Sequence, residues 1–257
     1  MITPNNTLFI GKVLHLLDAI GSTNQYALDM LSKNKPSEGT IFLTHNQYAG
    51  RGQVNKHWES EPGKNLTFSL LLYPNFLPAR QQFLLSQAIS LGIAETLQAF
   101  IPKKISIKWP NDLYVEERKI TGILIQNSLK GSSLQSAVVG IGLNVNQAIF
   151  KSDAPNPTSI FLETNQLLSL DFVLDKLCQH LEQRYLQLKA GRYQQLQADY
   201  RQFLFRLNEP HLYKRPDNTV FSGTIKGVTE IGQLQMETAQ GMEVFSLKEV
   251  GYILSGL

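Results

Sequence analysis

Two lysines, an amide and a carboxylate lie close together near the middle of the chain, in a pattern that suits a site for an anion. Lys108 precedes Pro110, Asn111 and Asp112 follow directly, and Lys119 begins the next apolar stretch. Proline restricts the residue before it to extended backbone, so a strand should end here in a rigid turn. Lysines held beside such a turn can neutralise carboxylate or phosphate groups. Taken singly, Asn111 and Asp112 are common turn residues and both lysines could be ordinary surface residues.

A glycine-containing loop upstream offers a second set of anion-binding candidates. Arg51 stands between Gly50 and Gly52, and Gln47 and Trp58 flank this loop. Glycines let backbone amides approach a ligand, and arginine can add a bidentate contact. The tripeptide alone is common, so it also fits a solvated surface loop.

Two further polar segments could contribute to the same site. Residues 140–146 read GIGLNVN, with two glycines and two asparagines in a strand-like stretch. Glycine within a strand marks a close approach of other atoms, which could be a ligand or a tightly packed helix. Residues 22–24, Ser-Thr-Asn, fit a helix N-cap, and the free backbone donors of a helix start could also bind a ligand.

In this order along the chain, the motifs resemble those of biotin–protein ligases, over roughly residues 16–252. The resemblance implies that Lys119 contacts the biotin carboxylate and the α-phosphate of ATP, and that Arg51 shares the charge handling. It assigns biotin binding to Ser22, Thr23, Asn24, Gln47, Arg51, Gly52, Gln53 and Lys119. It assigns ATP or adenylate binding to Arg51, Trp58, Lys108, Asn111, Asp112 and Asn144, with Asn146 also near the adenosine.

The activity implied by the resemblance has two steps. Biotin and ATP give biotinyl-5′-adenylate, with Mg²⁺ accompanying the ATP. The biotinyl group then passes to one lysine of a biotin carboxyl carrier protein, with acetyl-CoA carboxylase as the expected owner. The sequence leaves a homodimer open. The pattern begins by residue 16, which leaves too few residues for a helix-turn-helix, so specific DNA binding is not expected.

This chain departs from the usual pattern of the resembled family at several positions. Gln53 and Asn55 stand where arginine and glycine are common, Lys56 replaces an arginine, and Gln126 stands where glutamate is common. The reduced charge of the loop bears on how firmly biotinyl-adenylate would be retained.

Two alternatives remain. A lipoate or octanoate ligase or transferase of the same fold is the nearer one, but a transferase needs a nucleophilic cysteine. Cys178 lies on an apolar helical stripe and is expected to be a buried structural thiol. A biotin-binding module without catalysis is disfavoured by the presence of Lys119, Asn111 and Asp112 together.

Composition favours a soluble cytoplasmic protein. Of 257 residues, 42% are hydrophobic and 18% charged, and the net charge of +3 is too small to indicate nucleic-acid binding. The single cysteine fits a reducing compartment. The N-terminus has no signal-peptide pattern, and no apolar run approaches the ~20 residues of a membrane helix. The histidines lack zinc-ligand spacing, so no structural metal site is expected.

The periodicities predict an α+β fold with a mixed, mainly antiparallel sheet and helices packed on it. Residue 207 is followed by short strands, so we place a domain boundary between residues 1–207 and 208–257. The resemblance implies a class II aminoacyl-tRNA synthetase-like catalytic domain and a small SH3-like C-terminal barrel. Strands are expected at 13–17, 40–44, 66–70, 105–108, 119–126, 137–145, 220–225, 232–236, 243–247 and 252–254. Helices are expected from residue 24 and at 78–100, 174–188 and 192–203.

Overall fold

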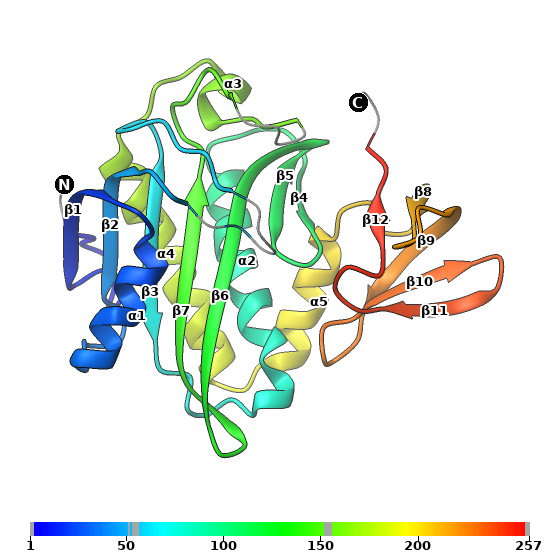
Figure 1. The fold of residues 1–257 in the computed structure, drawn as a ribbon, viewed down its shortest axis with the longest axis horizontal. Coiled ribbons are helices and arrows are strands. Elements are labelled where there is room, and N and C mark those ends of the chain that lie inside the picture. The colour runs from blue at the N-terminus through cyan, green and yellow to red at the C-terminus, as the bar shows by residue number, and fades with distance from the viewer. Residues whose placement is uncertain (1–2, 51, 53–56, 152–155, 255–257) are drawn as a thin grey trace.

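A computed structural model describes residues 3–50, 52, 57–151 and 156–254 of the chain. Two β-sheets and a layer of helices make up the fold (Figure 1). The first sheet contains β1 (Leu14–Ile20), β2 (Ile41–Gln47), β3 (Leu66–Leu72), β4 (Ile105–Lys108), β5 (Asp112–Val115), β6 (Arg118–Lys130) and β7 (Ser133–Leu143). The second contains β8 (Pro210–Lys214), β9 (Val220–Val228), β10 (Leu234–Thr238), β11 (Gly241–Phe245) and β12 (Gly251–Tyr252). The helices are α1 (Thr23–Lys33), η1 (Ala79–Gln81), α2 (Phe83–Gln98), α3 (Ile160–Thr164), α4 (Leu170–Lys189) and α5 (Tyr193–Phe203).

The first sheet is mixed and mainly antiparallel, which confirms the predicted class. Its strand order is β1-β2-β3-β7-β6-β5-β4. Only β1 and β2 pair in parallel among the described strands, and every other pair is antiparallel. The order places the long β6–β7 hairpin inside the sheet, where β6 pairs with β5 near its start and β7 pairs with β3 over its last residues, 137–143.

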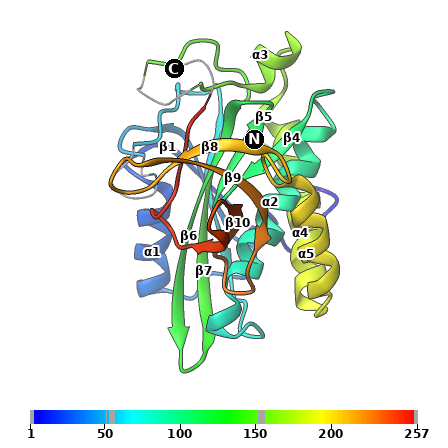
Figure 2. The ribbon, with the colours of Figure 1, turned by 90° about the vertical axis from the view of Figure 1, so that its right-hand side faces the viewer.

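Helices cover the two faces of this sheet unequally (Figures 1 and 2). Helices α2, α4 and α5 pack together behind it, and α1 packs on the opposite face against β2, β3 and β7. The predicted apolar stripe of α4 is confirmed, because Leu174, Leu177, Leu181, Tyr185 and Leu188 are all fully buried. Among the described helices, α1 is the one that packs on this face, which leaves room beside it for a cavity.

Helix α1 begins where the sequence predicts. Ser22 has extended backbone, and its side-chain oxygen accepts a hydrogen bond from the backbone N–H of Gln25. This is the geometry of an N-cap, which satisfies one of the free donors of the first turn.

Some sequence-based expectations are wrong. The alternation of apolar and polar residues over 66–70 predicts a half-buried strand, but β3 is buried along its whole length, because α1 covers the side that carries Thr67 and Ser69. Strands β5 and β8 were not predicted, and Asp112 is the first residue of β5, not a turn residue. The position of Lys119 at the start of an apolar strand predicts a place at the edge of the sheet, but β6 is an internal strand.

The second sheet has the order β11-β10-β9-β8-β12, with antiparallel pairing throughout. The turn between β9 and β10 is tied to the first sheet, because the indole N–H of Trp109 donates to the carbonyl of Gly232 at 2.8 Å. The two sheets share one hydrophobic core, which includes Tyr213 and Ile225 together with Leu113. Within the described residues, no helix is long and apolar enough to cross a membrane.

Candidate active site

A cavity of about 1010 Å³ opens on the α1 face of the first sheet and extends to the second sheet. It brings together nearly all the candidates taken from the sequence. The predicted site residues that line it are Ser22, Thr23, Asn24, Gln47, Gly52, Trp58, Lys108, Asn111, Asp112, Lys119 and Asn144. Arg51 and Gln53, with Asn55 and Lys56, lie outside the described residues.

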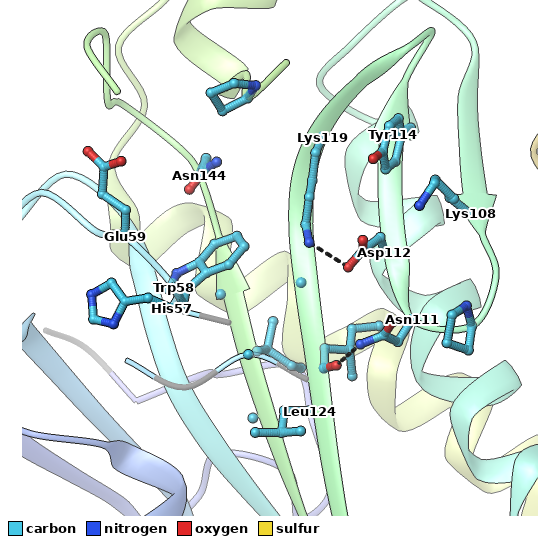
Figure 3. A pocket seen from close by; sticks show the side chains of 18 of the residues that line it. His57, Trp58, Glu59, Lys108, Asn111, Asp112, Tyr114, Lys119, Leu124 and Asn144 are labelled. Carbon is cyan, nitrogen blue, oxygen red and sulfur yellow. Dashed lines mark hydrogen bonds and ion pairs between the residues drawn. The ribbon is translucent and has the colours of Figure 1, made fainter. Parts of the chain in front are cut away.

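The centre of the cavity holds an ion pair between two adjacent strands. The Nζ of Lys119 on β6 lies 2.7 Å from Oδ1 of Asp112 on β5 (Figure 3). Both side chains are largely buried, with 23% and 18% exposed respectively. The same Nζ lies 5.7 Å from the centre of the Trp58 ring. A lysine held in this way is a fixed positive charge at the place where two anionic substrates could meet.

A β-bulge directs Lys119 into the cavity. Leu113 pairs with Thr121 but Tyr114 pairs with Lys119, so Ile120 is an extra residue on β6. With strict alternation, Lys119 would face away from the side that Gly122 presents to the cavity. The bulge turns it to the same side, which is a known use of bulges beside functional sites.

The backbone of Lys119 is held on its other side by a later segment. Its N–H donates to the carbonyl of Asn156, and its carbonyl accepts from the N–H of Thr158, both at 2.8 Å. The side-chain hydroxyl of Thr158 donates to Glu163, whose fully buried carboxylate also pairs with Arg118. The position of Lys119 is therefore fixed from both flanking segments.

A buried polar cluster forms one end of the cavity. The Gln47 side-chain carbonyl accepts from the backbone N–H of Thr23 at 2.9 Å. The Nδ2 of Asn24 donates to the Leu124 carbonyl and to Gln126. The Oγ of Ser69 lies 2.8 Å from Thr23 Oγ1 and 2.6 Å from Asn24 Oδ1. Ser69 was not predicted, although its polar side chain in an apolar strand is a signal that could have found it.

Two glycines on β7, Gly140 and Gly142, line the cavity beside this polar cluster. A β-carbon at Gly140 would lie 2.3 Å from Asn24 Oδ1, and one at Gly142 would lie 2.2 Å from Trp58 Cε2. Gly142 pairs with Gly122, where the Trp58 ring is also close. The packed-helix explanation is confirmed at Gly140, which the start of α1 approaches, whereas at Gly142 the close approach comes from the Trp58 side chain.

The predicted asparagines Asn144 and Asn111 both line the cavity and donate to backbone carbonyls. The Nδ2 of Asn144 donates to the carbonyl of Thr158 at 2.9 Å, and its buried Oδ1 has no partner among the described residues. The Nδ2 of Asn111 donates to the carbonyl of Ile123. Asn146 does not line the cavity, and its side chain instead bonds the backbone of Leu168.

Several cavity-lining residues were not predicted from the sequence. The second sheet contributes Lys214, Lys248 and Tyr252 to the cavity, and the 57–59 segment contributes His57 and Glu59. Lys108 links the two parts, because its Nζ lies 4.4 Å from the centre of the Tyr252 ring. No local pattern in the sequence identifies these residues, since the contact joins segments that are more than a hundred positions apart.

Comparison with known proteins agrees with this arrangement. The Biotin/lipoate A/B protein ligase family matches residues 16–144, half of the chain. The chain therefore belongs to this family.

Individual relatives extend the similarity beyond the matched region. A biotin–[acetyl-CoA-carboxylase] ligase of Paracoccus denitrificans is 28% identical over 240 residues, which cover 91% of this chain and 98% of that one. The bifunctional ligase/repressor BirA of Bacillus spizizenii is 26% identical over 242 residues, 92% of this chain and 73% of its own length. The structure of the Aquifex aeolicus biotin protein ligase in complex with biotin and ATP superimposes with a TM-score of 0.79 and 25% identity. It covers 95% of this chain and 100% of that one.

Proposed function

We propose that this chain is a biotin–protein ligase that activates biotin with ATP and transfers it to a lysine of a biotin carboxyl carrier domain. The observation that carries the proposal is the position of Lys119. Its ammonium is paired with Asp112. It lies between the buried polar cluster around Asn24 and the part of the cavity that Trp58 and Asn144 line. A cation at this point is where a carboxylate bound at one end would meet a phosphate bound at the other.

We assign biotin to the polar end of the cavity. The hydrogen-bonding groups of Ser22, Thr23, Asn24 and Gln47 suit its ureido group, and Lys119 would face its carboxylate. ATP is assigned to the other end, with Trp58 stacking on adenine and Asn111 and Asn144 reading its edge. The unpartnered Oδ1 of Asn144 supports this, since a buried acceptor without a partner is costly unless a ligand supplies a donor. Arg51, Gly52 and Gln53 complete the site in this proposal.

In the first step, a carboxylate oxygen of biotin attacks the α-phosphorus, and the bond from that phosphorus to the bridging oxygen of pyrophosphate breaks. Two anions must approach, and Lys119 offsets their repulsion and stabilises the charge that develops. The products are biotinyl-5′-adenylate and pyrophosphate.

In the second step, the acceptor lysine of the carrier attacks the biotinyl carbonyl as a neutral amine. The bond between the carbonyl carbon and the phosphate oxygen breaks, and AMP leaves with that oxygen. The amine loses one proton as the amide forms. Because the adenylate is a good leaving group, the step needs no covalent enzyme intermediate. Acetyl-CoA carboxylase is the proposed owner of the carrier.

Magnesium is part of the proposal as a companion of ATP. Two described carboxylates line the cavity, Asp112 and Glu59, and no group of three metal-ligating side chains exists among the described residues. This donor set fits an ion held mainly by substrate phosphates and water, with Asp112 as the carboxylate beside Lys119. When bound, the ion would screen the phosphate charges.

An octanoyltransferase of the same family is the weaker candidate. Such a reaction needs an accessible thiolate, but the sole cysteine, Cys178, is fully buried within α4. Burial raises the pKa of its thiol well above the usual range, with further contributions from Asp175 and Glu182. An inert structural thiol is the consequence. A lipoate ligase needs no such cysteine. Binding of lipoate in place of biotin would distinguish it from a biotin–protein ligase.

The proposal includes an architecture. Residues 1–207 form the catalytic unit, related to the class II aminoacyl-tRNA synthetase fold, and residues 208–257 form a C-terminal unit related to SH3-like barrels. The separate five-stranded sheet that begins at Pro210 supports the boundary. A cytoplasmic location follows from the same assignment, and specific DNA binding has no part in it.

Isothermal titration with biotin and with lipoate tests the substrate class. Biotin should bind, more tightly in the presence of a non-hydrolysable ATP analogue, and lipoate should not. Tight binding of lipoate in place of biotin would transfer the assignment to the other branch of the family.

A further inference from the structure

The second sheet presents a group of lysines to the cavity that the proposed reaction has not yet used. Lys214 on β8 and Lys248 between β11 and β12 both line the cavity, as does Lys108 from the first sheet. Neither Lys214 nor Lys248 forms an ion pair with any described residue. We call Lys108, Lys214 and Lys248 the lysine wall.

The side chain of Lys214 is supported by the strand beside it. Lys214 pairs with Gly251 on β12, and a β-carbon at Gly251 would lie 2.9 Å from Lys214 Cγ and 3.1 Å from its Cε. The aliphatic stem therefore lies across the backbone of Gly251, which itself lines the cavity. The next residue, Tyr252, carries the ring that lies under the ammonium of Lys108. Strand β12 thus supports two of the three lysines.

Lys248 is held at the cavity by a tight turn. The N–H of Ser246 donates to the Glu249 carboxylate at 2.6 Å, and the N–H of Glu249 donates to the carbonyl of Ser246. Lys248 has a φ of +73°, a conformation that is strained for a residue with a side chain. Strain of this kind persists where the surroundings enforce it, and it is concentrated at functional sites.

The charges of the cavity indicate what the lysine wall binds. Five lysines line the cavity in the described part of the chain, against two carboxylates. Lys119 is already paired with Asp112, so it is only partly available to a polyanion. A triphosphate carries several negative charges beyond its α-phosphate, and these need cations at a distance from Lys119.

We propose that Lys214 and Lys248, together with Lys108, bind the β- and γ-phosphates of ATP and the pyrophosphate that leaves. This inference rests on the proposed function and extends it. It makes the second sheet part of the first half-reaction, because its lysines stabilise the leaving group as the α-phosphate is transferred to biotin. The second half-reaction, in which AMP leaves, does not need these two lysines.

The test uses Lys214→Gln, Lys248→Gln and the double variant in the full chain. For each single variant we expect the KM for ATP and the inhibition constant of inorganic pyrophosphate to rise by about tenfold. Transfer of biotin from synthetic biotinyl-5′-adenylate to a carrier domain should keep its rate. The matched control is Lys226→Gln, which removes a lysine from the same sheet that pairs with Glu237 outside the cavity.

Two outcomes would overturn the lysine wall. One is an unchanged response to ATP and pyrophosphate in the double variant. The other is a loss confined to the carrier step, which would make the wall a docking surface for the carrier.

Titration of inorganic pyrophosphate into the wild type and the double variant, without biotin, separates this inference from the proposed function. Binding that the double variant loses supports the wall even if no biotinyl-adenylate forms. Equal binding, or none to the wild type, rejects it.

Gly251→Ala gives an independent check with both lysines retained. Its β-carbon would displace the Lys214 stem, so the affinity for pyrophosphate should fall in the same direction as in Lys214→Gln. Unchanged affinity would show that the stem position does not matter for phosphate binding, against the proposal.

Discussion

Lys119 and Asp112 form an ion pair of 2.7 Å across the β5–β6 ladder, although strict strand alternation would turn the lysine away from the cavity. The bulge at Ile120 brings the two side chains to one face. Asp112 then fixes the ammonium before substrates arrive, so little reorganisation is needed when negative charge develops beside it.

Replacing Lys119 by methionine tests this role. Lys119→Met keeps the aliphatic stem but removes the charge, so biotin-dependent pyrophosphate release should fall by at least about a hundredfold. The melting temperature should change little, because the lysine is at the cavity and not in the core. Lys130→Met, on the exposed end of the same strand, should release pyrophosphate at the normal rate. Normal release by Lys119→Met would remove this lysine from the mechanism.

The two strand glycines should separate the two substrates. In Gly140→Ala the new β-carbon would meet Asn24, and in Gly142→Ala it would meet the Trp58 ring. We expect the first variant to lose mainly affinity for biotin and the second mainly affinity for ATP, each by roughly tenfold or more.

Titration calorimetry with each ligand measures both affinities. The two variants are controls for each other, because they change adjacent positions on the same face of β7. If both lose the same ligand, the division of the cavity into two ends is wrong.

Glu163 should stabilise the fold near the site. Its fully buried carboxylate lies 2.9 Å from Lys103 Nζ and 2.7 Å from Arg118. Glu163→Gln should lower the free energy of unfolding by about 1–3 kcal/mol. The loss is no larger because Lys103 and Arg118 are both partly exposed to solvent. Thermal unfolding should show a melting temperature lower by roughly 2–8 °C. Glu237→Gln removes an exposed pair and should shift it by less than about 2 °C. Equal shifts in melting temperature would mean that the buried ion pairs of Glu163 stabilise the fold no more than an exposed pair does.

Gln53 bears on retention of the intermediate. This residue lies outside the described part of the chain, so the prediction rests on the sequence. Biotin–protein ligases commonly have arginine there, and a charge-assisted hydrogen bond contributes about 1.5–3 kcal/mol. Gln53→Arg should therefore slow the escape of preformed biotinyl-adenylate by roughly ten- to a hundredfold. Equal dissociation rates in both proteins would show that this position does not control retention.

The parts of the fold that local chemistry determines could be predicted from the sequence. Ser22 caps α1 because its side chain and the N–H of Gln25 are near neighbours in the chain. The buried stripe of α4 follows from helical periodicity. The cavity collected most of the candidate residues because the motifs lie on paired strands.

Features set by pairing over long distances could not be predicted. The bulge at Ile120 depends on the register between β5 and β6, and a hydrophobic pattern does not reveal an extra residue. Lys214 and Lys248 reach the cavity only because the second sheet packs beside Lys108 and Tyr114. Trp58 lies on Gly142 across many intervening positions, and neither residue alone predicts the contact.

The most direct test of the account is incubation of the protein with biotin, ATP, Mg²⁺ and a biotin carboxyl carrier domain, followed by mass spectrometry of the carrier. The account predicts addition of one biotinyl group at a single lysine, with AMP and pyrophosphate released in step. It also predicts no addition with Lys119→Met or when lipoate replaces biotin. A carrier that stays unmodified with biotin, or that accepts lipoate instead, would contradict it.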